Sequence, residues 1–167
     1  MMNQQRVKTV ETQSLYIAYG EHGPESGWPV ILSHGFPYDV HAFDEVAVIL
    51  ARAGARVITP YTRGFGPTRF VSSAILRNGQ QTARARDIVQ LADALGLQRP
   101  ILGGFGWGGN ASCVAAALWR RNGLVAWSLM LATTSLMCAN RSIPPSLRWS
   151  GSFGISTSFK PNVAGNA

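Results

Sequence analysis

Hydrophobic and polar side chains alternate in residues 14–19, where the chain reads SLYIAY. A period of two predicts a half-exposed β-strand, and we expect this strand to belong to a hairpin over residues 6–21. Residues 29–33, PVILS, form a short apolar run that is rich in β-branched side chains. Such a run is typical of a buried strand in a parallel sheet.

A helical period follows this buried run. Apolar positions recur at helical spacing between residues 43 and 53, at Phe43, Val46, Ala47, Ile49 and Leu50. Gly54 then predicts the end of a helix. The cycle repeats with a strand at residues 56–60 and a helix at residues 80–95, whose apolar stripe is Ile88, Leu91, Ala92 and Leu95. A third cycle places a strand at residues 100–103 and a helix at residues 110–119. This alternation predicts the α/β class, with a mostly parallel sheet, flanking helices and right-handed crossovers.

The pattern dissolves after Trp119. Residues 123–131 are compatible with one more strand or helix, but residues 142–167 are rich in Ser, Pro, Gly and Asn and have no period. We therefore expect residues 1–119 to form the N-terminal part of an α/β domain. Residues 120–167 are predicted to be an aberrant, poorly ordered tail.

Composition and charge narrow the possible partners. A chain of 167 residues with 46% hydrophobic side chains is long enough for one domain with a core. The net charge of +7 would ordinarily suggest nucleic acid as a partner. However, residues 1–119 carry ten basic and eight acidic side chains, whereas residues 120–167 carry five basic and no acidic ones. Because the excess is concentrated in the tail, no nucleic-acid partner is predicted.

The N-terminal segment and the cysteines give little information about the function of the chain. Residues 1–13 contain no apolar run of the kind a signal peptide needs, so we expect a cytoplasmic protein. Cys113 and Cys138 have neither the number nor the neighbours for a disulfide framework or a zinc site, and no metal or cofactor is predicted. The uncharged residues 122–140 are rich in Ser, Thr and Asn, so no membrane segment is expected.

Residues 101–110, ILGGFGWGGN, carry the candidate chemistry. A nucleophile elbow needs an apolar strand, a turn whose reactive residue has small residues two positions away on both sides, and a helix that starts at once. Gly104 and Gly108 fit these flanking positions, and Gly106 occupies the nucleophile position. Glycine has no side chain with which to attack. The segment therefore predicts an elbow without its nucleophile.

The same segment also fits a second motif. Gly104, Gly106 and Gly109 have the spacing of the glycine-rich dinucleotide-binding loop between a strand and a helix. That loop normally opens the first strand–helix–strand unit and is followed about 20 residues later by an acidic residue. Here it falls in the third unit, with Trp107 inside the turn and no Asp or Glu after it. Dinucleotide binding is thus the weaker alternative.

Three segments occur in a characteristic order: LSHGFP at residues 32–37, PYTRGFG at residues 60–66 and GGFGWGG at residues 103–109. In this order and spacing they resemble the α/β-hydrolase superfamily, and most of all its branch of epoxide hydrolases and haloalkane dehalogenases. The resemblance implies a partial hydrolase fold that lacks the cap and the C-terminal strands.

The resemblance also implies roles for single residues. An aspartate nucleophile is expected where Gly106 stands, and the backbone N–H groups of Phe36 and Trp107 would form the oxyanion hole. The structural frame around them would consist of the following residues: His34, Gly35, Pro37, Gly104, Gly108 and Gly109. In this superfamily the catalytic acid and histidine follow the nucleophile along the chain.

No such partners follow here. The last acidic residue is Asp93, and the three histidines are His22, His34 and His41. We expect His34 to support the oxyanion loop and the other two to lie at the surface. The sequence therefore predicts a hydrolase-family protein that is catalytically inactive. The alternative is a non-enzymatic relic or a pseudo-hydrolase that binds a small apolar ligand near Phe36, Trp107 and Tyr61.

Other polar residues are given structural interpretations. Arg63 and Arg69 are expected in a solvated loop. Acidic residues that precede or begin a helix are expected to cap it, namely Asp39, Asp44 and Glu45. Asp87 and Asp93 are expected on an exposed helix face.

The tail has an interpretation of its own. With the codon boundary shifted by one base and with free choice of synonymous codons, residues 122 onward can encode an acidic, hydrolase-like sequence. We therefore hypothesise that residues 120–167 are translated out of frame.

Overall fold

A computed structural model describes residues 7–118 and 125–129. Its strands are β1 (Lys8–Glu11), β2 (Leu15–His22), β3 (Trp28–Ser33), β4 (Ala55–Pro60), β5 (Arg69–Phe70), β6 (Ile101–Phe105) and β7 (Val125–Leu129). Its helices are the short 3-10 helix η1 (Val40–Phe43), α1 (Asp44–Arg52), α2 (Gln81–Ala94) and α3 (Gly106–Leu118). Among the residues described, no helix is long and apolar enough to cross a membrane.

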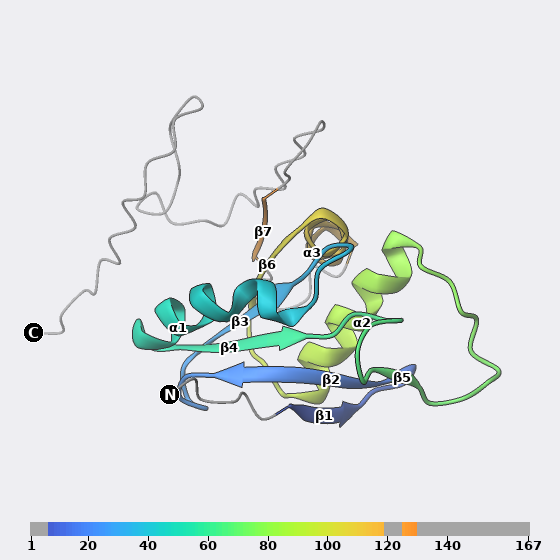
Figure 1. The fold of residues 1–167 in the computed structure, drawn as a ribbon, viewed down its shortest axis with the longest axis horizontal. Helices are drawn as coiled ribbons and strands as arrows, with labels where there is room; N and C mark the ends of the chain where they lie inside the picture. Colours follow the sequence, from blue (N-terminus) through green and yellow to red (C-terminus); the bar gives the residue numbers. More distant parts are fainter. Residues whose placement is uncertain (1–6, 119–124, 130–167) are drawn as a thin grey trace, which may run out of the picture.

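The strands form one seven-stranded sheet in the order β1-β2-β4-β3-β6-β7, with β5 paired to β2 (Figure 1). The first two strands form the expected antiparallel hairpin, and β2 also runs antiparallel to β4. From β4 onward the neighbours β4–β3, β3–β6 and β6–β7 are parallel. The prediction of a mostly parallel α/β sheet is confirmed. Since β7 lies between residues 120 and 167, the sheet continues one strand beyond residue 119.

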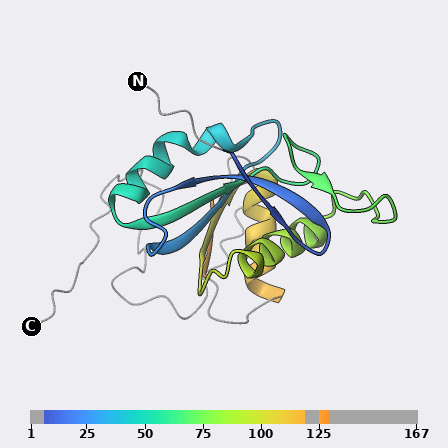
Figure 2. The same ribbon diagram turned by 90° about the horizontal axis from the view of Figure 1, so that it is seen from below.

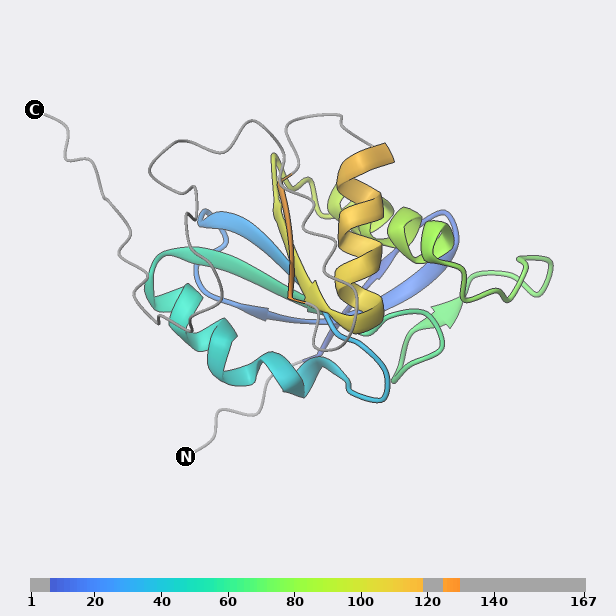
Figure 3. The ribbon, with the colours of Figure 1, turned by 90° about the horizontal axis from the view of Figure 1, so that it is seen from above.

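Helices cover both faces of the sheet, as Figures 2 and 3 show. On one face Ile31, Ile58 and Leu102 pack with apolar residues of α2 and α3. The neighbouring strand positions Val30, Leu32 and Val57 point to the other face and pack with residues of η1 and α1. This division follows from the two-residue period of a strand, which sends successive side chains to opposite faces. Helices on both faces explain why the central strands are apolar at consecutive positions.

Two details of the predicted pattern are wrong. Strand β2 is not half-exposed: Ile17 packs toward α2, and Ala18, on its other face, packs with Val40 and Tyr61. The alternating pattern did not predict the contacts of Ala18, because alanine is small and only weakly apolar. In α1, Ala47 is buried, but Val46 and Ile49 are exposed, Ile49 to 65%. The helix therefore presents a narrower face to the sheet than its apolar stripe suggested.

Helix α3 starts at Gly106, immediately after β6 and four residues before the predicted start. This abrupt start brings the turn close to β3. A Cβ atom built on Gly104 would overlap the backbone of Ser33. A Cβ atom built on Gly108 would overlap the backbones of both Ser33 and His34. Only a residue without a Cβ atom permits the two backbones to approach so closely. The need for glycine at both flanking positions therefore comes from strand β3.

Replacing Gly108 by alanine should be strongly destabilising, because the new methyl group can be accommodated only if the backbone of β3 or α3 moves. We expect Gly108→Ala to lower the free energy of unfolding by about 3 kcal/mol. Gly79→Ala is the matched control, since a Cβ atom at Gly79 meets nothing within 4 Å, and it should change stability by less than about 0.5 kcal/mol. Urea denaturation of both variants measures the difference. Equal midpoints would contradict the close approach.

Candidate functional site

The turn between β6 and α3 forms the centre of the candidate site. Gly106 is the first residue of α3 and has φ +52, in the left-handed region that L side chains rarely adopt. A Cβ atom built there would meet only the Cα atom of Gly35, at 3.6 Å. The space beside residue 106 is therefore bounded by the loop after β3 and otherwise open. This turn has the strand–turn–helix arrangement expected of a nucleophile elbow, with no side chain at the nucleophile position.

Phe36 and Trp107 lie next to each other at this turn. Their rings stack with centroids 5.2 Å apart and an angle of 28° between the planes, and both side chains are exposed. Trp107 belongs to the first turn of α3, where backbone N–H groups have no acceptor within the helix. The structure thus brings together the two residues that the sequence assigned to an oxyanion hole. Their role as donors stays a prediction.

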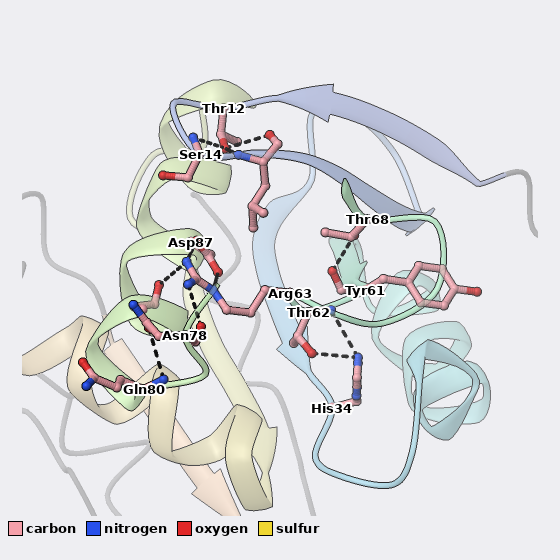
Figure 4. A network of polar contacts seen from close by, with 12 residues as sticks. Thr12, Ser14, His34, Tyr61, Thr62, Arg63, Thr68, Asn78, Gln80 and Asp87 are labelled. Carbon is pink, nitrogen blue, oxygen red and sulfur yellow. Dashed lines mark hydrogen bonds and ion pairs between the residues drawn. The ribbon is translucent and has the colours of Figure 1, made fainter. Parts of the chain in front are cut away.

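His34 connects this loop to the end of β4 (Figure 4). Its ring is buried, and its Nε2 atom accepts a hydrogen bond from the backbone N–H of Thr62 at 3.2 Å. The Nδ1–H group then donates to the carbonyl oxygen of Gly35 at 3.3 Å. Burial, the largest influence, lowers the pKa of His34. A neutral imidazole held by two backbone groups fixes the loop that carries Gly35 and Phe36.

Arg63 and Asp87 form a buried ion pair at the same end of the sheet (Figure 4). The Nε and Nη2 atoms of Arg63 each lie 2.6 Å from one carboxylate oxygen of Asp87. The two side chains are only 8% and 10% exposed. The predictions of a solvated Arg63 and an exposed Asp87 are therefore wrong. Arg63 also donates to the carbonyl oxygens of Asn78 and Ala83, so it anchors the long loop before α2.

The titration of Asp87 reflects two opposing influences. Burial raises the pKa of Asp87, and the hydrogen bonds and charge of Arg63 act in the opposite direction. The net shift is upward, but the bidentate contact needs an ionised carboxylate. The sequence held one signal for this burial: Asp87 lies four residues before Leu91, a spacing that places both on one face of the helix.

A cavity of about 20 Å³ lies between α2, the start of α3 and the ends of β2 and β4. Its walls are mostly apolar and include Leu15, Ile17, Ile88, Leu91 and Ala111. The polar side chains that line it are His34, Thr62, Arg63, Arg84 and Asp87. Tyr61 and Trp107, two of the three residues predicted to lie near a ligand, also line it, whereas the third, Phe36, contacts Trp107 and is not a lining residue.

Arg84 is a cavity residue that the sequence did not single out. Its guanidinium carbon lies 4.6 Å from the centre of the Trp107 ring, a distance typical of a cation–π contact. Burial, followed by repulsion from Arg63, lowers the pKa of Arg84. The helical period did contain a signal for this position, because Arg84 lies four residues before Ile88 and seven before Leu91, on the face of the apolar stripe.

The remaining candidate residues lie apart from this cavity. Asp39 caps η1 by accepting from the backbone N–H of His41, and Asp44 and Glu45 lie in the first turn of α1, as expected. Gly109 is buried inside α3. Cys113 is buried in α3 as well, while Cys138 lies outside the described residues. In the described part of the chain no three His, Cys, Asp or Glu residues are placed to hold a metal ion.

Comparison with known proteins identifies the family. The model of the alpha/beta hydrolase fold matches residues 29–121, more than half of the chain. The chain belongs to this family. The matched region contains the loop of His34, the Arg63 turn and the β6–α3 turn, which are the parts that form the site described above.

Individual hydrolase-fold relatives match over a limited length. A haloalkane dehalogenase of Mycobacterium marinum is 32% identical over 92 residues, which cover 53% of this chain and 31% of the relative. An epoxide hydrolase of Caballeronia sordidicola is 29% identical over 109 residues, covering 65% and 32% of the two chains. The chain thus spans about a third of the length of these curated relatives.

Solved structures give the same assignment. A Klebsiella pneumoniae protein provisionally named an epoxide hydrolase is 45% identical, with a TM-score of 0.71 over 74% of this chain and 41% of that one. Epoxide Hydrolase A of Mycobacterium thermoresistibile shares the fold at 24% identity, with a TM-score of 0.67 over 75% of this chain and 39% of that one.

The buried His34 should make the stability of this hydrolase-fold chain depend on pH. Its pKa is lowered by folding, so the unfolded chain binds the proton more readily, and stability should fall as the pH drops below the ordinary value of about 6.5. The slope can reach at most about 1.4 kcal/mol per pH unit for one group. His34→Asn should flatten this dependence.

Urea denaturation between about pH 5.5 and 7.5 measures the slope, in the range where carboxylates of ordinary pKa remain ionised. His41→Asn is the control, because His41 is exposed, and it should retain the pH dependence that comes from His34. A slope that persists in His34→Asn would contradict the assignment to His34.

Proposed function

We propose that this chain is a catalytically inactive member of the α/β-hydrolase family that retains a small-molecule pocket. The observation that supports the proposal is the β6–α3 turn, which has the backbone of an elbow and glycine at its reactive position. Covalent hydrolysis at an elbow needs a side chain that attacks the substrate, and Gly106 offers none. Relatives of the matched segment are named epoxide hydrolase and haloalkane dehalogenase.

The missing partners support the same conclusion. The second step of such a mechanism needs a histidine, oriented by an acid, to activate water. No Asp or Glu follows Asp93, and no histidine follows His41. Of the earlier histidines, His34 already uses both ring nitrogens for backbone contacts. It is therefore poorly suited to accept a proton from water.

The retained pocket favours a binding role over a relic without function. Its walls are apolar, and exposed Phe36 and Trp107 rings lie beside it. We expect a small apolar ligand or one with an apolar part. Dinucleotide binding is less well supported, because Gly104 lies against the backbone of Ser33 and no acidic residue follows the glycine-rich turn. A cytoplasmic location remains part of the proposal.

Neither the unmodified chain nor Gly106→Asp should hydrolyse styrene oxide or p-nitrophenyl acetate above the rate of buffer. The restored carboxylate alone is insufficient, because no histidine is placed to complete the reaction. Initial rates with each substrate, with Gly79→Asp as a control for an added surface carboxylate, test this expectation. Turnover by the unmodified chain that is lost on heat denaturation would overturn the proposed inactivity.

We also propose that residues 120–167 are translated out of frame from a gene that once encoded a longer hydrolase. The disappearance of acidic residues after Asp93 and the end of the family match at residue 121 support this proposal. Sequencing the coding DNA and the region after it should reveal another frame that continues into an acidic strand and a later histidine motif. If no such frame exists, the proposal is wrong.

A further inference from the structure

Arg84 carries a charge that the described residues do not compensate. Its Nε and Nη1 atoms are buried, and neither has a hydrogen-bond partner among the residues described. Leaving buried N–H groups of a charged side chain without an acceptor is destabilising. The contact with the Trp107 ring offsets part of this cost, but a ring face supplies no oxygen acceptor.

Acidic side chains of the chain are engaged elsewhere or lie at the surface. Asp87 gives both carboxylate oxygens to Arg63. Glu21 pairs with Lys8 and Arg56. The other acidic residues are capping or exposed: Glu11, Glu25, Asp39, Asp44, Glu45 and Asp93. Since no Asp or Glu follows Asp93 in the sequence, the chain has no further acidic side chain to offer Arg84.

The surroundings of Arg84 describe the ligand that would fit. Arg84 lines the cavity together with Ile88, Leu91 and Ala111. About 20 Å³ is room for about one water-sized group, such as the methyl end of a short chain, and excludes a bulky ligand. A positively charged group with unpaired N–H donors favours an anionic acceptor, and a carboxylate oxygen accepts such a charge-assisted hydrogen bond. The apolar walls favour a short alkyl chain.

We propose that Arg84 binds the carboxylate of a short-chain alkyl carboxylate, whose hydrocarbon part packs on the walls formed by α2 and α3. This inference rests on the proposed retention of a small-molecule pocket and adds the chemical class of the ligand. The carboxylate compensates the positive charge of Arg84. Its oxygens accept from guanidinium N–H groups that have no acceptor among the residues described.

Propionate is the test ligand, and propionamide is its neutral counterpart of nearly equal size. The ¹H–¹⁵N spectrum of the ¹⁵N-labelled chain reports on arginine Nε–H groups directly, and sodium chloride keeps the ionic strength constant. We expect one Nε–H signal to shift saturably with propionate, at a Kd on the order of 1 mM. Propionamide should bind at least about tenfold more weakly, since it cannot form the charge-assisted contact.

Arg84→Gln should remove that signal and weaken propionate binding at least about tenfold. Arg86→Gln is the matched control, because Arg86 is exposed on the same helix, and it should bind propionate as the unmodified chain does. If Arg84→Gln gives no folded spectrum, the comparison of propionate with propionamide on the unmodified chain decides.

The outcomes distinguish a failure of the carboxylate inference from a failure of the proposed pocket. If propionamide binds as tightly as propionate, the chain retains a pocket but the carboxylate inference is wrong. An Nε–H signal that responds to chloride as strongly as to propionate would equally overturn it, in favour of a general anion site. If neither compound shifts any signal up to about 100 mM, which corresponds to negligible affinity, the proposed pocket function fails together with the inference.

Discussion

The contact between the β6–α3 turn and the end of β3 is the constraint on which the rest of the site depends. Gly104 and Gly108 lie so close to the backbone of Ser33 that a side chain at either position would collide with it. This approach fixes where α3 begins and places Trp107 beside Phe36. It also forms one wall of the cavity between α2 and α3. The flanking glycines are therefore required by packing, whether or not the residue between them can attack a substrate.

The packing of this turn depends on the glycines at 104 and 108 and not on the side chain at residue 106. A change from a nucleophile to glycine at residue 106 therefore need not lower the stability of the fold. Residue 106 is held at φ +52, where a residue with a Cβ atom is strained by about 1–3 kcal/mol. An enzyme that keeps a reactive side chain there accepts this strain as part of its function. Glycine adopts the same conformation without it. The hydrolase scaffold can thus lose its reactive side chain and keep the turn.

The sequence predicted the repeating elements well, because each depends on its own period: apolar runs for β3 and β4, and a helical stripe with Ile88 and Leu91 for α2. It predicted less well the contacts between segments that are far apart along the chain. The burial of Ala18 depends on Val40 and Tyr61, and the burial of Asp87 depends on Arg63. Local periods contain no information on such pairs. The β6–α3 turn could be predicted because its close packing leaves a glycine pattern within ten residues.

The charge at the cavity depends on which of two arginines, Arg63 or Arg84, pairs with Asp87. Arg84 and Asp87 are three positions apart on α2, a spacing at which a helix can form its own ion pair. Arg63 nevertheless takes both oxygens of Asp87, because its planar guanidinium reaches them side by side from the loop after β4. Arg63 also donates to the carbonyl oxygens of Asn78 and Ala83, which Arg84 does not contact. The loop is thereby stabilised, whereas the positive charge of Arg84 beside Trp107 is left without a carboxylate partner among the described residues.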